Sequence, residues 1–109
     1  METKITITEV HVTKHVELKV ETEGSININD MLSLEYADNT YYFRPLELHS
    51  TDKGTTAILK ERGYWANRLH RADRLHKNAV DYKKLIGLNM SVVTDKDLIK
   101  KIDIESTYC

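Results

Sequence analysis

The first half of the chain alternates apolar and polar residues with a period of two. Its regular part is the run Val10, Val12, Val16, Leu18 and Val20, in which β-branched side chains predominate. This pattern is typical of strands that bury one face and expose the other. We therefore expect strands across residues 1–50, in a chain of 109 residues that is long enough for one hydrophobic core.

The alternation changes parity near its start. Ile5 and Ile7 occupy odd positions, whereas Val10 and the apolar residues after it occupy even positions. A shift of one residue turns every side chain to the opposite face, so an irregularity must lie between the two runs. Two interpretations fit: one long strand with a bulge near Thr8–Glu9, or two strands that meet near Thr13–Lys14.

A hairpin is predicted further along the chain. Residues 31–37 would pair with residues 41–48 around Asp38 and Asn39, which favour tight turns. Pro45 has no amide hydrogen, so its strand should lie at a sheet edge or carry a bulge there. An exposed edge strand, or a stripe of Trp and Tyr side chains, would also offer a route to a homodimer.

The second half of the chain changes to a helical period. Between residues 64 and 86 the apolar side chains fall on one stripe of a helical wheel: Trp65, Leu69, Ala72, Leu75, Ala79, Tyr82 and Ile86. This predicts a long amphipathic helix, either continuous with residues 56–62 through Gly63 or separated there from a short helix. Residues 90–93 suggest a short strand, and Thr94 suggests a helix cap. Residues 98–104 fit a helix better than a strand.

Together these patterns predict the α+β fold class. One antiparallel sheet of about four to five strands, built from meanders or hairpins in the N-terminal half, would be packed by one long amphipathic helix, with a short C-terminal strand or helix. Residues 1–109 would form a single domain with an acidic, β-rich half (1–50) and a basic, α-rich half (51–109). The first half holds four basic and nine acidic residues, and the second holds twelve and eight.

Motifs that carry catalysis are absent from the sequence. The four glycines are isolated, which excludes a phosphate-binding loop or dinucleotide fingerprint, and no Gly-x-Ser-x-Gly sequence occurs. His11 and His15 would lie about 13 Å apart on one strand, too far to share a metal ion. We therefore expect a protein that is not an enzyme and that holds neither a metal nor a cofactor.

The cysteine content and the absence of long apolar runs bear on localisation. Cys109 is the only cysteine, and no run approaches the roughly 20 apolar residues that span a bilayer. The first residues also lack the apolar core of a signal peptide. These features predict a cytoplasmic protein without a membrane partner.

Two surfaces are candidates for binding. The first is acidic and aromatic, and its predicted residues are Glu17, Glu21, Glu23, Tyr36, Tyr41 and Tyr42. The acids would share the strand face opposite the valines, and the tyrosines would cluster near the hairpin turn. A row of acids suits a basic groove on a partner protein, and tyrosine is favoured at interfaces.

The second candidate is the basic face of the predicted long helix. Residues 60–84 hold eight basic and three acidic side chains, and the residues assigned to binding are Arg68, Arg71, Arg74, Lys77 and Lys84. Such a stripe suits the phosphate backbone of a nucleic acid. Spacings of four residues between Asp73, Lys77 and Asp81 are equally typical of a solvated helix face.

Arg68 is unusual because the helical wheel places it within the apolar stripe. Three explanations stay open: its side chain extends past the stripe to solvent, pairs with a sheet carboxylate such as Glu35 or Glu47, or lines an anion site.

The resulting hypothesis is a small protein-binding module. In size and in lack of motifs the chain resembles the small antagonists that phages and mobile elements carry against host defence systems. That resemblance implies an inhibitor of a nucleic-acid-handling host protein, met through the acidic face. The alternative hypothesis is direct nucleic-acid binding through the basic helix face.

Overall fold

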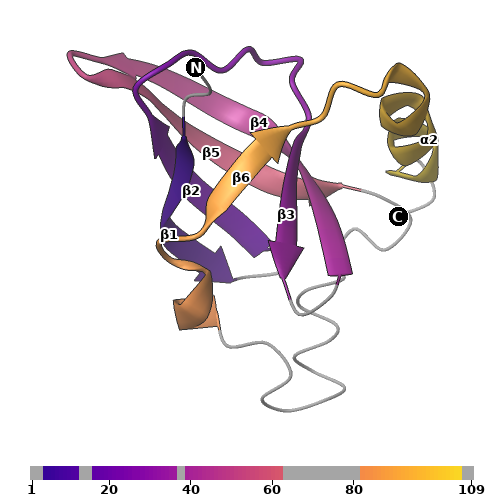
Figure 1. The fold of residues 1–109 in the computed structure, drawn as a ribbon, viewed down its shortest axis with the longest axis horizontal. Helices are drawn as coiled ribbons and strands as arrows, with labels where there is room; N and C mark the ends of the chain where they lie inside the picture. Colours follow the sequence, from indigo (N-terminus) through magenta and orange to yellow (C-terminus); the bar gives the residue numbers. More distant parts are fainter. Residues whose placement is uncertain (1–3, 13–15, 37–38, 63–81, 107–109) are drawn as a thin grey trace.

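A computed structural model describes residues 4–12, 16–36, 39–62 and 82–106. These residues form a closed antiparallel barrel with one short α-helix beside it (Figure 1). The strands are β1 (Ile5–Val12), β2 (Val16–Thr22), β3 (Leu32–Tyr36), β4 (Asn39–Thr51), β5 (Gly54–Arg62) and β6 (Asn89–Val92). Their order around the barrel is β1-β2-β5-β4-β3-β6, and β6 pairs with β1 to close it.

The predicted α+β fold class is wrong, because the sheet closes on itself instead of packing against a long helix. Residues 56–62, which were expected to be helical, belong to β5, where they alternate between the interior and the outside of the barrel. Of the predicted long helix, residues 82–85 form the short 3-10 helix η1 (Tyr82–Leu85). Residues 63–81 lie outside the described residues.

The structure contains both irregularities that the parity shift suggested. A bulge lies in β1 between Ile7 and Glu9, and β1 and β2 are separate strands that pair with each other. The bulge turns the odd-numbered Ile5 and Ile7 and the even-numbered Val10 towards the same interior, where all three pack.

The β3–β4 hairpin is confirmed, with Leu34 opposite Tyr41. The register of β4 against β5 shifts between Pro45 and Glu47, so the predicted bulge at the proline is also confirmed. The edge alternative is wrong, because β4 lies between β5 and β3. Every described strand has a neighbour on both sides, and β6 pairs with β1 and with β3 through two residue pairs each.

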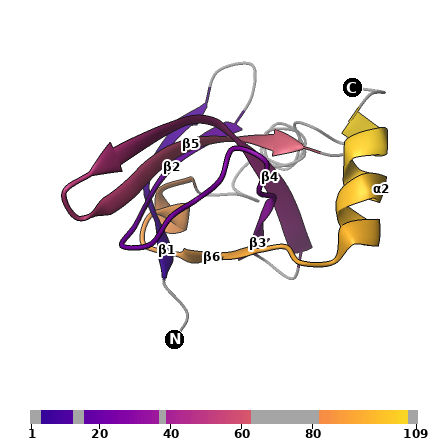
Figure 2. The same ribbon diagram turned by 90° about the horizontal axis from the view of Figure 1, so that it is seen from above.

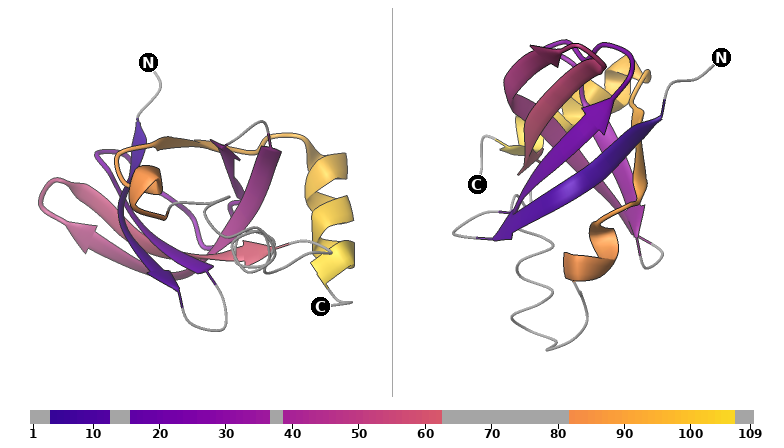
Figure 3. Two further views of the ribbon diagram at one scale, coloured as in Figure 1. Left: turned by 90° about the horizontal axis from the view of Figure 1, so that it is seen from below. Right: turned by 90° about the vertical axis from the view of Figure 1, so that its left-hand side faces the viewer.

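The hydrophobic core fills the barrel. Its buried members are Ile5, Ile7, Val16, Leu18, Val20, Ile26, Leu32, Leu34, Tyr41, Phe43, Ala57, Leu59, Leu85 and Met90. Leu85 comes from η1, which lies at one end of the barrel where the chain approaches β6 (Figure 3). Two backbone hydrogen bonds hold this approach to β1, from Gly87 to the Ile7 carbonyl (2.8 Å) and from Ile7 to the Leu88 carbonyl (2.9 Å).

The C-terminal helix α2 (Lys96–Ser106) confirms the helical interpretation of residues 98–104, and β6 confirms the short strand before it. The helix stands outside the barrel (Figure 2). Ile102 is buried, and Arg44 of β4 donates to Asp103 of the helix and to the carbonyl of Asn29. The cap is Asp95 rather than Thr94, since its Oδ1 accepts the amides of Asp97 (3.0 Å) and Leu98 (3.2 Å).

Replacing Asp95 by alanine is expected to destabilise α2 by about 1 kcal/mol, because two amides of its first turn lose their acceptor. Hydrogen exchange should become faster in residues 96–104, while the amides of the barrel strands keep their protection. Thr94→Ala is the matched control and should leave exchange in the helix unchanged. A larger effect from Thr94 than from Asp95 would contradict this assignment of the cap.

Candidate functional site

The predicted acidic row lies along the outside of β2. Antiparallel register places Glu17 between His11 of β1 and Lys60 of β5. The same register places Glu21 between Thr6 and Thr56. The alternation of β2 thus turns these acids outwards, and their cross-strand neighbours differ from one end of the strand to the other.

The basic side chains near the row form their ion pairs with Glu9 of β1, and no member of the row is ion-paired to a described residue. Lys19 lies 3.7 Å from Glu9, measured from Nζ to Oε2, and the His11 ring lies 3.4 Å from the same carboxylate. Glu21 and Glu23 form no ion pair with any described residue. Glu17 has the basic neighbours His11 and Lys60 across the strands, whereas Glu21 and Glu23 lie at the end where β2 leaves the barrel wall.

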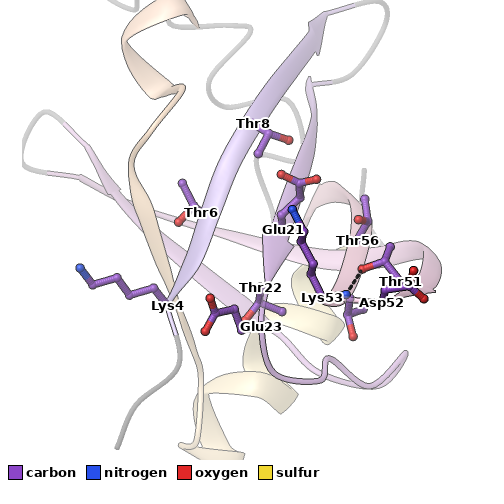
Figure 4. Close-up of a pocket in the computed structure, with 11 residues that line it drawn as sticks. Lys4, Thr6, Thr8, Glu21, Thr22, Glu23, Thr51, Asp52, Lys53 and Thr56 are labelled. Carbon is purple, nitrogen blue, oxygen red and sulfur yellow. Dashed lines mark hydrogen bonds between the residues drawn. The ribbon is translucent and has the colours of Figure 1, made fainter.

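An open depression occupies this end of the barrel wall (Figure 4). It has a volume of about 1040 Å³ and lies over parts of β1, β2, β5 and the turn between β4 and β5. The residues that line it are Lys4, Thr6, Thr8, Glu21, Thr22, Glu23, Thr51, Asp52, Lys53, Thr55 and Thr56. Every residue that lines it is a threonine or carries a charged side chain, whereas hydrophobic and aromatic residues predominate in most small-molecule pockets.

A close backbone contact at Gly54 and two hydrogen bonds shape the depression. Gly54 has a φ of +147°, and a Cβ at this position would lie 2.0 Å from the carbonyl oxygen of Thr22. Only glycine allows the β4–β5 turn to approach the end of β2 so closely. The Thr55 hydroxyl then donates to the Gly24 carbonyl (3.0 Å), and the Gly24 amide donates to the Thr22 hydroxyl (3.2 Å).

The charges around the depression are exposed and free of ion pairs with described residues. Three acids (Glu21, Glu23 and Asp52) and two lysines (Lys4 and Lys53) line it, which leaves a balance of −1. Figure 4 shows them at three places around the hollow: Lys4 before β1, Glu21 and Glu23 at the end of β2, and Asp52 and Lys53 on the β4–β5 turn. Mixed, exposed charges of this kind can bind an oppositely patterned surface.

The three predicted tyrosines do not share a surface with these acids. Tyr41 is 4% exposed and belongs to the barrel core, and Tyr36 packs partly against that core. Tyr42 points outwards and lies opposite Arg62 of β5. β5 lies between β4 and β2, and Lys60, two residues before Arg62 on β5, faces Glu17. The tyrosine therefore lies towards the Glu17 end of the wall and away from Glu21.

The predicted basic face is mostly beyond what the structure describes. Arg68, Arg71, Arg74 and Lys77 fall within residues 63–81, and Lys84 is exposed in η1. Glu47, one suggested partner of Arg68, lies 3.3 Å from the ring of His49 on the outside of β4. The explanations for Arg68 therefore stay predictions.

Sequence reasoning missed the contribution of the β4–β5 turn to the depression. Asp52 and Gly54 flank a lysine between two alternating runs, which is a recognisable hairpin signal. That signal was obscured because residues 56–62 were assigned to a helix. Lys4 and Thr6 were missed because their position in the site depends on the pairing of β1 with β2.

Comparison with known proteins adds no functional assignment. In the described part of the chain, no three potential metal ligands come together, and no helix has both the length and the apolar character needed to cross a membrane. No family model, curated protein or solved structure matches the chain.

Proposed function

We propose that the chain is a small non-enzymatic module of the cytoplasm that binds a basic segment of a partner protein in the depression of Figure 4. The observation that carries the proposal is the exposed set Glu21, Glu23 and Asp52, which lines one concave surface without ion pairs to described residues. Carboxylates in that position are available to lysine and arginine side chains of another protein.

The threonines give the same surface a second means of recognition. Several of their hydroxyls are already used within the barrel: Thr8 donates to the carbonyl of Lys19, and Thr6 donates to Asn89. Each hydroxyl oxygen keeps a further lone pair that can accept from a partner. The two lysines at the edge would repel a misplaced basic side chain, so charge here favours orientation and association rate more than affinity.

The partner class follows from charge complementarity. Proteins that handle nucleic acids carry basic grooves, because they must neutralise phosphates. A segment from such a groove fits the acidic side of the depression, and its occupation would compete with nucleic acid. The proposed role is therefore that of an inhibitor or antagonist of a nucleic-acid-handling protein.

The first test is capture of the tagged chain from a lysate of its host, with and without nuclease. We expect one stoichiometric protein that survives nuclease treatment. Recovery of nucleic acid alone, lost after nuclease, would instead favour the basic face that includes Arg68 and Arg71. That face stays a prediction because those residues are not described.

Neutralising the depression should weaken binding to the purified partner about tenfold. The variant is Glu21→Gln, Glu23→Gln and Asp52→Asn, which removes three exposed ion pairs worth up to about 0.5 kcal/mol each. Isothermal titration calorimetry at two salt concentrations would measure the loss.

The matched control removes three exposed acids elsewhere on the molecule, by Glu9→Gln, Glu35→Gln and Glu47→Gln. It changes the net charge by the same amount and should alter the affinity less than threefold. Equal losses in the two variants would show that only net charge matters and would reject the depression as the binding surface.

A further inference from the structure

The outer wall of β4 and β5 carries a second charged surface, of opposite sign. Register places Tyr42 opposite Arg62 and Arg44 opposite Lys60, and alternation turns all four side chains to the outside. We call these four residues the β4–β5 patch. It lies towards the opposite end of β5 from Thr56, which lines the depression.

Within the β4–β5 patch two cations face each other directly. Like charges opposite one another on neighbouring strands repel, so an anion nearby is favourable. Asp103 of α2 supplies one: its two carboxylate oxygens accept from Nε (3.1 Å) and Nη2 (2.5 Å) of Arg44. This two-point geometry is the one that arginine also uses for phosphate.

Lys60 and Arg62 are not compensated in this way. Neither forms an ion pair with a described residue, although Glu17 is the neighbour of Lys60 on β2. The two cations lie two residues apart on one strand, a separation of about 6.6 Å. That step is comparable with the distance between successive phosphates of an extended single strand.

Tyr42 adds a feature that phosphate binding alone does not need. Its ring is partly exposed beside Arg62, where a nucleobase could stack while the cations hold the backbone. The four side chains of the patch come from two paired strands of the barrel wall, which form a surface and not the projecting helix or ribbon that reads a duplex groove. We infer that the β4–β5 patch binds the phosphate backbone of single-stranded nucleic acid, and that Asp103 limits the affinity by occupying Arg44.

The inference is tested by fluorescence anisotropy with a labelled oligothymidylate, an oligouridylate and a duplex of equal length. The wild-type chain should bind both single strands and bind the duplex at least tenfold more weakly. Lys60→Gln with Arg62→Gln should lower the affinity at least tenfold and reduce the slope of log K against log salt by about 1.4. Lys4→Gln with Lys53→Gln removes two lysines from the depression and should change neither value.

Two further variants separate the roles of Tyr42 and Asp103. Tyr42→Ala should weaken binding about tenfold without changing the salt slope, because stacking involves no charge. Asp103→Asn should raise the affinity several-fold and steepen the slope by about 0.7, since Arg44 becomes available to phosphate. Asp103→Glu keeps the charge and should behave as the wild type, and circular dichroism would verify that α2 remains folded.

Three outcomes would overturn the inference. In the first, the wild type does not bind either single strand at low salt. In the second, it binds the duplex as tightly as the single strands. In the third, the variant with Lys60→Gln and Arg62→Gln loses no more affinity than the variant with Lys4→Gln and Lys53→Gln. None of these outcomes bears on the protein partner proposed above, because that partner contacts the opposite end of the wall.

Discussion

Replacing Gly54 by alanine is expected to destabilise the barrel by about 3 kcal/mol, whereas the same change at Gly87 costs about 1 kcal/mol. Both glycines have positive φ, +147° at Gly54 and +92° at Gly87, so both variants carry backbone strain. The two positions differ in the space that is available for a new methyl group. The new methyl group at Gly54 would meet the Thr22 carbonyl at 2.0 Å, and the one at Gly87 would meet nothing within 4 Å.

The clash at Gly54 cannot be relieved cheaply, because all three nearest atoms belong to the backbone of Thr22 and Glu23. The β4–β5 turn must move away from the end of β2, which breaks the hydrogen bond from Thr55 to the Gly24 carbonyl. The same movement would displace Asp52 and Lys53 from the depression. Gly54→Ala should therefore reduce binding of the protein partner even at temperatures where the variant stays folded.

Urea denaturation of the two variants would measure the difference, with the midpoint compared at constant m value. The loss of stability in Gly87→Ala gives the cost of positive φ alone. The additional loss in Gly54→Ala gives the cost of the close approach between the β4–β5 turn and the end of β2. Similar losses at both positions would show that the turn does not pack against β2 as described. Hydrogen exchange at the end of β2 would then locate whatever change had occurred.

Much of the barrel's N-terminal half is predictable because the relevant signals are local. The parity shift required an irregularity, and the bulge between Ile7 and Glu9 has the position that one interpretation proposed. The turn-favouring Asp38 and Asn39 predicted the β3–β4 hairpin. Pro45 predicted a bulge because a missing amide hydrogen disturbs any ladder, wherever the strand lies in the sheet.

The error in the second half arose where local signals are ambiguous. Ala57, Ile58 and Leu59 are three consecutive apolar residues, which fit a helix turn or a strand equally well. Pairing decided the outcome: β5 lies between β2 and β4 and bonds to both. Of these partners, β4 directly precedes β5 in a hairpin, whereas β2 is distant in sequence and pairs Glu17 with Lys60, so no window around residues 56–62 contains the pairing with β2.

Only part of the candidate site could be predicted from the sequence. Alternation placed Glu17 and Glu21 on one outer face, as the structure does. Their different environments follow from cross-strand register, which sets Glu17 beside Lys60 and leaves Glu21 between threonines. The tyrosines show the same limit, since adjacent residues of one strand face opposite ways and only Tyr42 of the pair 41–42 points outwards.

Alanine variants of Phe43 and Tyr42 would test this alternation, because the expected difference between their losses of stability is large. Phe43 is fully buried in the barrel core, and Phe43→Ala should cost about 3–5 kcal/mol through lost apolar contact and the cavity left behind. Tyr42→Ala removes an aromatic ring of similar size from the outer wall and should cost about 1 kcal/mol or less. A domain of this size is stabilised by about 5–15 kcal/mol, so the first change approaches the threshold of unfolding.

Urea denaturation of both variants gives the comparison, and Phe43→Leu extends it if the alanine variant does not fold. The leucine should cost less than about 1.5 kcal/mol, because it keeps most of the apolar volume. The reverse order, with Tyr42 the costlier position, would mean that β4 is shifted by one residue and that its outward side chains are the ones assigned here to the core. In that case Arg44 would also face the interior, and neither the β4–β5 patch nor its bond to Asp103 could exist. The expected order instead leaves Tyr42→Ala folded, so that a loss of single-strand binding in this variant can be attributed to the missing ring.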